Sequence, residues 1–358
     1  MATAWGNEDI ASFYTTKHSW RGKYKRVFSV GTKAITTYNP TTLEVTNQWP
    51  YADFFGISPS SKSTNEFIVV VRKLKTKKTE SMTFSSDHRA DVLSSALKMR
   101  TLFAEAKAQK EMRCNAYKHH WSDNRVPILL NVSPCSLDQI DPASSKVLCS
   151  YEYKDLEGIA EVSNYPGGFV VVHGGFSRLH LFSCEERDDI IKKVQETALI
   201  NVGITIKKRK EPIDFNYFQT HRLGKYCNDE AITTLTEFKV QKLTQRSDDP
   251  VPRIFSLCET CIVERDPATY HICSLQPLCN VFSLVRAANN PQLFLVEYVR
   301  GFTRRYLCTE RDALLASLLD GVRASGNQEV HVHMAPTRRG FRLSPWYQPV
   351  DEEVSCLV

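Results

Sequence analysis

Short apolar runs separated by turn-forming residues recur along the chain and predict β-strands. The clearest runs come in pairs divided by a glycine or a basic loop: 66–72 with 79–84, 168–173 with 178–182, and 293–299 with 304–307. Two strand-like runs around such a break are typical of a β-hairpin. After each pair the apolar residues take helical spacing, at 92–103, 190–199 and 314–319. The pattern therefore predicts strands closed by one amphipathic helix, three times over.

Ordered motifs indicate an internal repeat behind this pattern. A turn that begins Asn-Pro or Asp-Pro occurs at Asn39, Asp141 and Asp266, and proline presets φ at the second position of such a turn. A small polar residue and an acid then precede each helix, as at a typical helix start. From turn proline to helix arginine, the stretches Pro40–Arg89, Pro142–Arg187 and Pro267–Arg311 span 49, 45 and 44 residues. The shared order and spacing predict three copies of one module.

The repeated unit also indicates a fold class. A strongly bent antiparallel sheet leaves one corner open, and a helix laid across that corner covers the core. We therefore predict a mainly β fold with some α, made of three tandem pleckstrin-homology-like modules, each a bent antiparallel sheet with a C-terminal helix. We place module 1 at 1–110, module 2 at 111–203 and module 3 at 231–326. A connector with a helix-like stretch is expected at 204–230, and a tail at 327–358.

Composition narrows the class of protein. With 42% hydrophobic and 24% charged residues among 358, the chain can bury real cores, which excludes wholesale disorder. No apolar run approaches about 18 residues, so we expect no transmembrane span. The first residues also lack the basic flank and apolar core of a secretory signal. We therefore expect a cytoplasmic protein whose eleven cysteines are reduced thiols rather than a disulfide framework.

The positive charge is unevenly distributed. Residues 1–100 hold 15 Lys and Arg against 8 Asp and Glu, a net of +7, whereas residues 101–358 hold 31 against 32, which leaves +6 for the chain. Much of the excess lies at 17–28, around Trp20, where no residue is acidic. The stretch after Trp121, which repeats Trp20, has lost that charge. A charge required by the fold would appear in both copies, so the asymmetry indicates one anionic partner for module 1.

A phosphoinositide is the partner that this segment favours. We expect a strand ending near Lys17, a turn through 20–22 that places Trp20 at a loop tip, and a second strand from Lys23 onward. Phosphate oxygens need several cationic donors around a pocket. Basic residues near an anionic membrane contribute about 1 kcal/mol each and a partly inserted indole about 2 kcal/mol, which together reach the micromolar range. The predicted lipid-binding residues are Lys17, Trp20, Arg21, Lys23, Tyr24, Lys25 and Arg26, with accessory membrane contacts from Arg72, Lys73, Lys75, Lys77 and Lys78.

Purely structural explanations of the same residues are also open. Trp20 and Tyr24 belong to residue types that are mostly buried, so both are compatible with the core, and the lysines with a solvated strand face. A basic hairpin tip such as 72–78 is also typical of simple solvation. The location of the Trp20 side chain therefore separates the two interpretations.

Long uninterrupted strings resemble a known family. The stretches 18–30, 43–50 and 315–327 look like the N-terminal region of the receptor-mediated endocytosis J-domain protein family, which are very large endosomal co-chaperones, and the resemblance covers nearly the whole chain. It implies a peripheral protein of the early endosome membrane that binds phosphatidylinositol 3-phosphate and acts in retromer-dependent, actin-linked cargo sorting. The family's lipid contact matches Lys17, Trp20, Tyr24 and Arg26.

One family element has no counterpart here. The 358 residues contain no His-Pro-Asp, the signature of a J domain. We therefore expect this chain to be an amino-terminal part of a longer protein. A heat-shock ATPase is expected as a partner only through a J domain outside the chain.

Catalytic and metal chemistry find little support in the sequence. Cys258 and Cys261, with Cys273 and Cys279, lack the glycine turn and second close pair of a zinc knuckle, and we interpret them as buried thiols on strands. The glycine pairs at 167–168 and 174–175 precede no Gly-Lys-Ser/Thr, so they are interpreted as turns. Neither a nucleophile elbow nor a carboxylate pair stands out, so we expect no enzyme, no cofactor and no metal.

Two other binding functions compete with the lipid hypothesis. The main alternative is a pleckstrin-homology-like scaffold that binds proteins or peptides and no lipid, with trafficking proteins as partners of modules 2 and 3. Nucleic-acid binding through 72–78 and 207–210 is disfavoured, because the chain lacks the interleaved aromatic residues of single-strand platforms.

Overall fold

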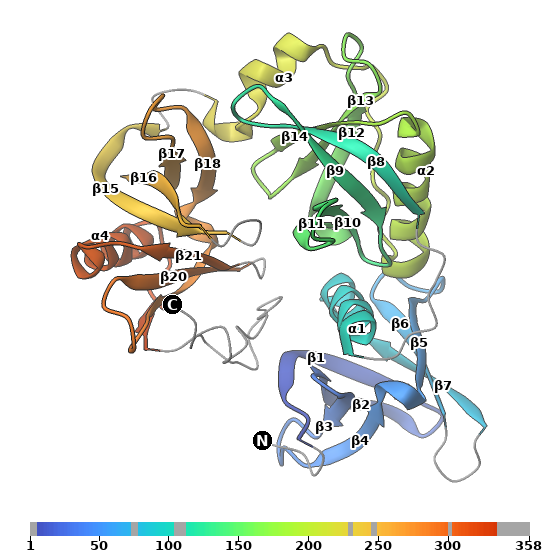
Figure 1. The fold of residues 1–358 in the computed structure, drawn as a ribbon. Coiled ribbons are helices and arrows are strands. Elements are labelled where there is room, and N and C mark those ends of the chain that lie inside the picture. Colours follow the sequence, from blue (N-terminus) through green and yellow to red (C-terminus); the bar gives the residue numbers. More distant parts are fainter. Residues whose placement is uncertain are drawn as a thin grey trace.

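The computed structural model describes residues 6–72, 78–103, 112–227, 232–244, 249–299 and 303–334. Three sheets of mainly antiparallel strands follow one another along these ranges, and each is followed by a helix. Figure 1 shows the first sheet in blue, the second in green above it, and the third in yellow, orange and red to the left. From here on, module 1, module 2 and module 3 each denote one sheet with its helix.

Module 1 is a seven-stranded sheet in the order β4-β3-β2-β1-β7-β6-β5. Strand β1 pairs with both β2 and β7, so it joins the first four strands to the last three. The strands are β1 (Asp9–Ser19), β2 (Gly22–Gly31), β3 (Ala34–Tyr38), β4 (Val45–Pro50), β5 (Phe54–Pro59), β6 (Glu66–Arg72) and β7 (Thr79–Ser85), and helix α1 (Arg89–Phe103) follows. A short 3-10 helix, η1 (Tyr51–Asp53), links β4 to β5.

Module 2 repeats this arrangement in the order β11-β10-β9-β8-β14-β13-β12. Its strands are β8 (Met112–His119), β9 (Arg125–Val132), β10 (Ser136–Ile140), β11 (Val147–Glu152), β12 (Leu156–Glu161), β13 (Gly168–His173) and β14 (Arg178–Ser183), with η2 (Tyr153–Asp155) between β11 and β12. Helix α2 (Arg187–Thr197) continues as a π-helical turn, η3 (Ala198–Val202). It ends at Gly203, whose φ of 74° is the left-handed conformation that terminates helices.

Module 3 has eight strands in the order β18-β17-β16-β15-β21-β20-β19-β22. They are β15 (Thr234–Leu243), β16 (Val251–Cys258), β17 (Cys261–Arg265), β18 (Ile272–Pro277), β19 (Val281–Arg286), β20 (Leu293–Tyr298), β21 (Thr303–Leu307) and β22 (Val332–His333), with η6 (Leu278–Asn280) between β18 and β19. Helix α4 (Arg311–Ala324) follows β21. Strand β22 lies parallel to β19 and is an addition that modules 1 and 2 lack within their described residues.

The proline turn has the same backbone in all three modules. The residue three positions after the proline is left-handed each time: Leu43, Ser145 and Tyr270 have φ values of 57°, 57° and 60°. The Asn or Asp before the proline accepts a hydrogen bond of 2.9 Å from a nearby backbone N–H: Thr41 to Asn39, Ser144 to Asp141, and Thr269 to Asp266. The predicted internal repeat is confirmed down to the conformation of its turn.

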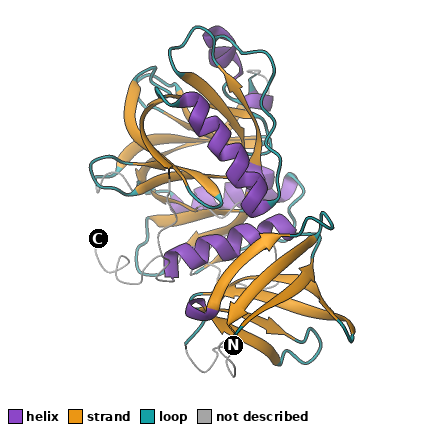
Figure 2. Ribbon diagram, turned by 90° about the vertical axis from the view of Figure 1, so that its right-hand side faces the viewer, coloured by secondary structure: helices purple, strands orange, loops and turns teal. Residues whose placement is uncertain are grey.

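Each helix covers the core that its sheet leaves open. Leu93 of α1, Ile190 of α2 and Leu318 of α4 are fully buried. Figure 2 shows the helices lying across the sheets. A bent antiparallel sheet with a C-terminal helix over its open corner is the pleckstrin-homology-like arrangement. The predicted fold class, mainly β with three such modules, is confirmed.

Modules 1 and 2 share one hydrophobic core. A continuous cluster of buried side chains extends from Phe28 in module 1 to Phe182 in module 2. At its edge, the guanidinium of Arg89 on α1 donates to the carbonyl of Gly203 at 3.1 Å. The two modules therefore bury apolar surface together.

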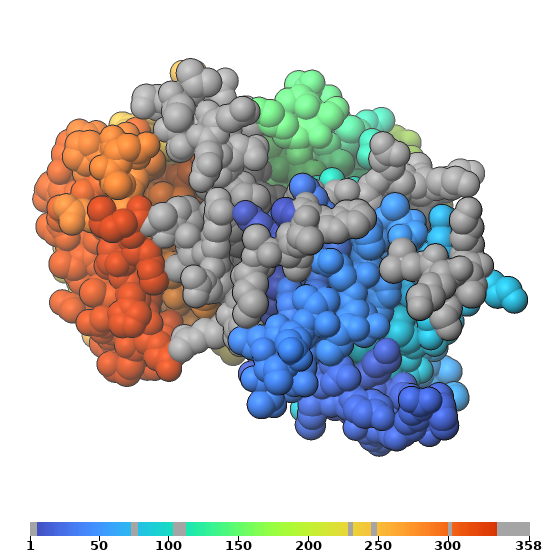
Figure 3. Space-filling model, turned by 90° about the horizontal axis from the view of Figure 1, so that it is seen from below, coloured from blue at the N-terminus to red at the C-terminus, as the bar shows by residue number. Residues whose placement is uncertain are grey.

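Module 3 has a core of its own and meets module 2 at the β13–β14 turn. Phe176 in that turn packs with buried residues of β17 and β18, among them Val263 and Leu275. Arg178 at the start of β14 donates to the carbonyl of Leu275 at 3.4 Å. Seen from below, modules 1 and 3 lie on opposite sides of the molecule (Figure 3).

The segment between modules 2 and 3 packs on module 2. It contains α3 (Phe215–His221) and the 3-10 helix η4 (Gly224–Tyr226), and the helix-like character predicted at 213–218 is met by α3. Ile213 and Phe218 join a buried cluster with Val170 and Leu181. Within the described residues, no helix combines the length and the apolar character needed to cross a membrane.

Candidate anion-binding face of module 1

The basic segment of module 1 forms a tight β-hairpin. Strand β1 extends to Ser19, two residues beyond the end that we expected near Lys17, because Ser19 still pairs with Gly22 on β2. Only Trp20 and Arg21 form the loop. Gly22 has a φ of 127°, which an L side chain rarely adopts, so glycine permits the strand to restart at once. The hairpin thus holds Trp20 at its tip.

Trp20 is exposed to solvent rather than buried. Its side chain is 87% exposed, and the Arg21 guanidinium lies 4.6 Å from the centre of its ring. The alternative that Trp20 belongs to the core is therefore wrong. Tyr24, at 38% exposed, is neither a core residue nor a fully exposed one. A large indole in water next to a cation is suited to meet an amphipathic surface. What it binds stays a prediction.

The strand register sorts the predicted residues onto two faces. Paired residues of antiparallel strands point to the same side of a sheet. Lys17 pairs with Tyr24 on β2 and with Phe84 on β7, and Phe84 is fully buried in the core. Arg26, two residues from Tyr24, lies on this side too. We call Lys17, Tyr24 and Arg26 the inner-face residues.

Two of the predicted lysines lie on the opposite side. Lys23 pairs with His18 and Lys25 with Thr16, which places both on the outer face of the hairpin, where they are exposed. The structure therefore brings Lys17, Tyr24 and Arg26 together beside the tip and separates Lys23 and Lys25 from them. Sequence reasoning placed these residues on a strand, a turn and a second strand without a register, so it did not separate the two faces.

The inner face has a concentrated positive charge. Burial lowers the pKa of Lys17, and the nearby Arg26 charge lowers it further, whereas Glu80 on β7 opposes the shift. Arg26 donates to the Lys25 carbonyl at 2.7 Å and lies 5.5 Å from the Tyr24 ring. Its buried Nε has no hydrogen-bond partner among the described residues. Two cations held near each other, one with an unused donor, form a site that an anion would stabilise.

The accessory basic loop lies mostly outside the described residues. Lys73, Lys75 and Lys77 belong to that undescribed part, so their predicted role has no structural counterpart here. Arg72 ends β6 with its guanidinium 5.1 Å from the exposed Phe55 ring, and 3.9 Å from Asp53. Lys78 is exposed just before β7. Their membrane contact stays a prediction.

Module 2 keeps a lysine at the inner-face position, three residues before Trp121 as Lys17 lies three residues before Trp20. Lys118 pairs with Phe182 on β14 as Lys17 pairs with Phe84 on β7. Its ammonium donates to the Tyr151 hydroxyl and lies 4.6 Å from the Phe182 ring centre. Burial lowers the pKa of Lys118 to about 8. The predicted loss of charge concerned the stretch after Trp121; before it the lysine persists, but its own module encloses it.

The hairpin tips of modules 1 and 2 differ in the same way. Trp121, the repeat of Trp20, is half-buried at the module 2 tip. The Arg253 guanidinium of module 3 lies 5.6 Å from its ring centre, and Arg222 donates to its carbonyl at 3.3 Å. Module 2 thus uses its tip for contacts within the chain, whereas the tip of module 1 is exposed.

The cysteines form two close pairs. Cys258 and Cys261 are buried, as predicted, but Cys273 is only half-buried and Cys279 is exposed on η6, so for these two the prediction of buried strand thiols is wrong. Elsewhere in the described ranges, the thiols of Cys114 and Cys184 and the exposed carboxylate of Glu186 converge within 4.8 Å. A hydrogen bond between the two thiols raises the pKa of Cys114 and lowers that of Cys184.

Comparison with solved structures finds partial likenesses only. The pleckstrin-homology domain of Slm1 in complex with inositol-4-phosphate covers 27% of this chain and 98% of its own at 12% identity, with a TM-score of 0.23. The linker-DH/PH domains of p115-RhoGEF cover 26% of this chain and 29% of their own at 11% identity, with a TM-score of 0.24. The description of the fold given above therefore depends on strand order and helix placement alone.

Sequence comparison is more specific. Residues 12–103 match the family model described as the DNAJ protein RME-8 N-terminal domain, and residues 114–206 match its 2nd domain, which together make up just over half of the chain. The DnaJ homolog subfamily C GRV2 of Arabidopsis thaliana is 26% identical over 385 aligned positions. That alignment covers 94% of this chain but 15% of the relative's length. The chain therefore belongs to the RME-8 family of DnaJ proteins.

Proposed function

We propose that module 1 recruits this protein to the early endosome membrane by binding a phosphoinositide, with phosphatidylinositol 3-phosphate as the headgroup. One observation carries the proposal: Lys17 and Arg26 share the inner face of the hairpin whose tip is the exposed Trp20. Cations at the base of the hairpin would bind the phosphate, and the indole at its tip would enter the bilayer interface. The role is recruitment and involves no catalysis.

The energetics suit a reversible membrane contact. Each basic residue near an anionic surface contributes about 1 kcal/mol, and partial insertion of the indole adds about 2 kcal/mol. The sum corresponds to micromolar affinity, which requires a second contact or a second copy for stable attachment. Arg72 and Lys78 are the described residues that we propose as accessory contacts.

The two faces of the hairpin provide a matched test. Lys17→Gln with Arg26→Gln and Lys23→Gln with Lys25→Gln each remove two positive charges, the first pair from the inner face and the second from the outer face. Binding is measured by co-sedimentation with vesicles that contain phosphatidylinositol 3-phosphate, and with vesicles that contain phosphatidylserine at equal charge. We expect the inner pair to lose the preference for the phosphoinositide, by about tenfold or more.

The outer-pair variant should bind both vesicle types more weakly, to a similar and salt-dependent extent, because those lysines act only through long-range electrostatic attraction. Circular dichroism and thermal unfolding of both variants serve as the folding control. Equal losses of vesicle binding for the two pairs would mean that binding depends on net positive charge alone. The inner face would then form no phosphate pocket. Unchanged phosphoinositide binding in the inner pair would refute the proposal.

A protein-binding scaffold is the second candidate, and one observation favours it. The equivalent tip of module 2 contacts a protein surface, since Trp121 lies against Arg253 of module 3. If module 1 binds trafficking proteins in the same manner, Trp20 would be required for their capture from lysate in the absence of lipid. Capture that is lost in Trp20→Ala, with no vesicle binding by the unmodified chain, would favour this candidate.

The chain spans 15% of the length of its curated relative, so the action of the whole protein is itself a proposal. We infer that these modules position a J domain, located elsewhere in the longer protein, on membranes where cargo is sorted with retromer. A heat-shock ATPase would then act at that membrane through the J domain. The modules themselves would determine which membrane the protein binds.

A further inference from the structure

Module 3 repeats the inner-face pair of module 1 in the same register. Lys242 on β15 pairs with Tyr306 on β21, as Lys17 pairs with Phe84 on the last strand of its module. Two residues earlier on the same strand, Val240 pairs with Arg253, as Thr15 pairs with Arg26. The lysine and the arginine therefore occupy equivalent positions in the two modules.

The two arginines also share their local geometry. Arg26 donates from Nη1 to the carbonyl of the residue before it at 2.7 Å, and Arg253 does the same to Pro252 at 2.7 Å. In both, Nε is buried and has no hydrogen-bond partner among the described residues. The hydrogen bond to the preceding carbonyl thus orients each guanidinium, and its Nε–H stays available to donate to another group. In module 2 the equivalent position, opposite Ala116, is the buried Ile128, so the arrangement is not a general requirement of the fold.

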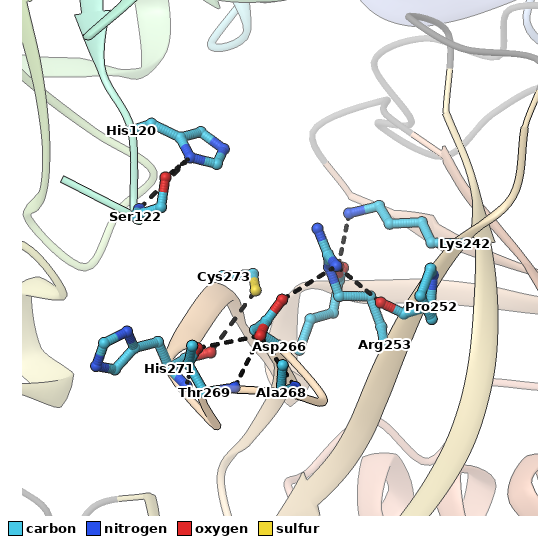
Figure 4. Close-up of polar contacts among 11 residues, drawn as sticks. His120, Ser122, Lys242, Pro252, Arg253, Asp266, Ala268, Thr269, His271 and Cys273 are labelled. Carbon is cyan, nitrogen blue, oxygen red and sulfur yellow. Dashed lines mark hydrogen bonds and ion pairs between the residues drawn. The ribbon is translucent and has the colours of Figure 1, made fainter. Parts of the chain in front are cut away.

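Further cations surround Arg253. Figure 4 shows Arg253 next to Lys242, with dashed lines from Arg253 to Pro252 and Asp266. Arg304 and Lys242 both pair with Glu264, and Arg178 of module 2 lies near enough to Arg304 for burial and that charge to lower the pKa of Arg178 to about 10.

Positive charge exceeds negative charge at this position. The group contains two carboxylates and four cations, which gives a net charge of +2. The carboxylates are Glu264 and Asp266, and the cations are Lys242, Arg253, Arg304 and Arg178. The Arg253–Asp266 contact is long, at 3.9 Å, and one Asp266 oxygen already accepts from the backbone of its own turn. Arg253 is therefore only weakly neutralised.

The cationic side chains are partly exposed to solvent. The side chains of Arg253, Arg304 and Lys242 are 15%, 17% and 21% exposed, whereas Glu264 beneath them is 1% exposed. Partly buried cations bind anions more strongly than fully solvated ones, because less water screens the charges.

We propose that module 3 is a second anion site, in which Lys242, Arg253 and Arg304 bind the phosphates of a small soluble polyphosphorylated molecule. The sequence that joins β15 to β16, 244–250, contains no aromatic residue and two aspartates, unlike the Trp20 tip of module 1. Nothing there suits insertion into a bilayer. The Arg253 side chain also faces Trp121 of module 2, so a bound anion would lie at the joint between the two modules.

Calorimetric titration of the whole chain with pyrophosphate tests this assignment. We expect saturable binding that Arg253→Gln weakens by at least about fivefold, since one charge-assisted hydrogen bond is lost. Arg253 has no close ion pair, so this variant should remain folded. The matched control is Lys239→Gln, which removes an exposed charge from the opposite face of β15 and should leave pyrophosphate binding unchanged. Arg253→Lys should restore part of the affinity.

Glu264→Gln provides an independent measurement. It removes the buried carboxylate between Lys242 and Arg304, so pyrophosphate should bind more tightly and raise the melting temperature of this variant more than that of the unmodified chain. Chloride at equal ionic strength should not reproduce the rise. Undetectable pyrophosphate binding, or equal losses in Arg253→Gln and Lys239→Gln, would overturn the assignment.

A vesicle-binding measurement distinguishes this site from the site of module 1. Arg253→Gln should bind vesicles with phosphatidylinositol 3-phosphate as the unmodified chain does. Loss of vesicle binding in Arg253→Gln without any effect on pyrophosphate would contradict a soluble ligand. Failure of vesicle binding in Lys17→Gln with Arg26→Gln, by contrast, concerns module 1 alone and leaves the pyrophosphate result intact.

Discussion

The indole of Trp20 is the residue on which the membrane hypothesis can be tested with the least structural disturbance. Its side chain is 87% exposed, so Trp20→Ala should change the free energy of unfolding by less than about 0.5 kcal/mol. Binding to phosphatidylinositol 3-phosphate vesicles should fall about tenfold or more, because the inserted surface is lost. Tyr14→Ala is the control, since Tyr14 lies on the same strand and is 65% exposed. Equal binding by the two variants would argue against insertion.

Lys118 of module 2 predicts an alkaline pH dependence of stability. Burial lowers its pKa in the folded chain to about 8, below its ordinary value of 10.5. Between these values the unfolded chain binds more protons than the folded chain, so this lysine makes the free energy of unfolding rise with pH, by up to about 1.4 kcal/mol per unit. Below pH 8 both states are protonated and the burial cost is constant.

Lys118→Met should remove this rise. Urea unfolding at pH 7.5, 9 and 10 would give a difference between the unmodified chain and the variant that grows in favour of the unmodified chain as pH increases. Lys23→Met, at an exposed position, should show no such trend. A constant difference across the three pH values would show that the ammonium is better solvated than its contacts with Tyr151 and Phe182 suggest.

Residues differ in how far the sequence alone could place them. The exposed position of Trp20 could be predicted, because a turn signal and dense charge coincide there. Lys118 can be aligned with Lys17, because each lies three residues before the repeated tryptophan. Lys242 could not be recognised as a counterpart, since its equivalence lies in its pairing with the last strand of module 3. Strand register depends on contacts between distant segments of the chain. A count of charges along the sequence therefore does not reveal it.

Elements were predicted more successfully than sites because their signal is local. The runs 66–72 and 168–173 coincide with β6 and β13, where alternation and turn residues define both ends. The hairpin in module 1 was placed two residues short, since only the pairing of Ser19 with Gly22 extends β1. Strand β22 is too short for any periodicity. Its place beside β19 depends on contacts between segments far apart in the sequence.

The hairpins explain how one element serves different purposes in one chain. The backbone frame is common to the modules, as the repeated turn shows, so the tip and the inner face can change without loss of the fold. Module 1 has an exposed tryptophan, module 2 buries its lysine against Tyr151, and module 3 pairs its lysine with Glu264. Differences in charge between the modules therefore reflect what each hairpin contacts and do not reflect a difference in topology.

At the scale of the whole molecule, the distribution of cores predicts two cooperative units. The cluster that contains Leu93 of α1 and Ile190 of α2 is continuous across modules 1 and 2, whereas Leu318 of α4 belongs to a separate cluster in module 3. A shared core couples the unfolding of the elements around it. Differential scanning calorimetry should therefore show two transitions, one for modules 1 and 2 together and one for module 3.

Single core substitutions can assign these transitions. Leu93→Ala and Ile190→Ala each remove fully buried methyl groups, at a cost of about 2–5 kcal/mol, and should lower the same transition by roughly 5–15 °C. Leu318→Ala should lower only the other. If Leu93→Ala and Ile190→Ala lowered different transitions, modules 1 and 2 would be independent despite their common cluster. If all three variants moved a single transition, the contact of Phe176 with module 3 would be strong enough to unite the whole chain. A rigid pair of modules 1 and 2 would hold the Trp20 tip in a fixed direction, which matters for how the longer protein approaches a membrane.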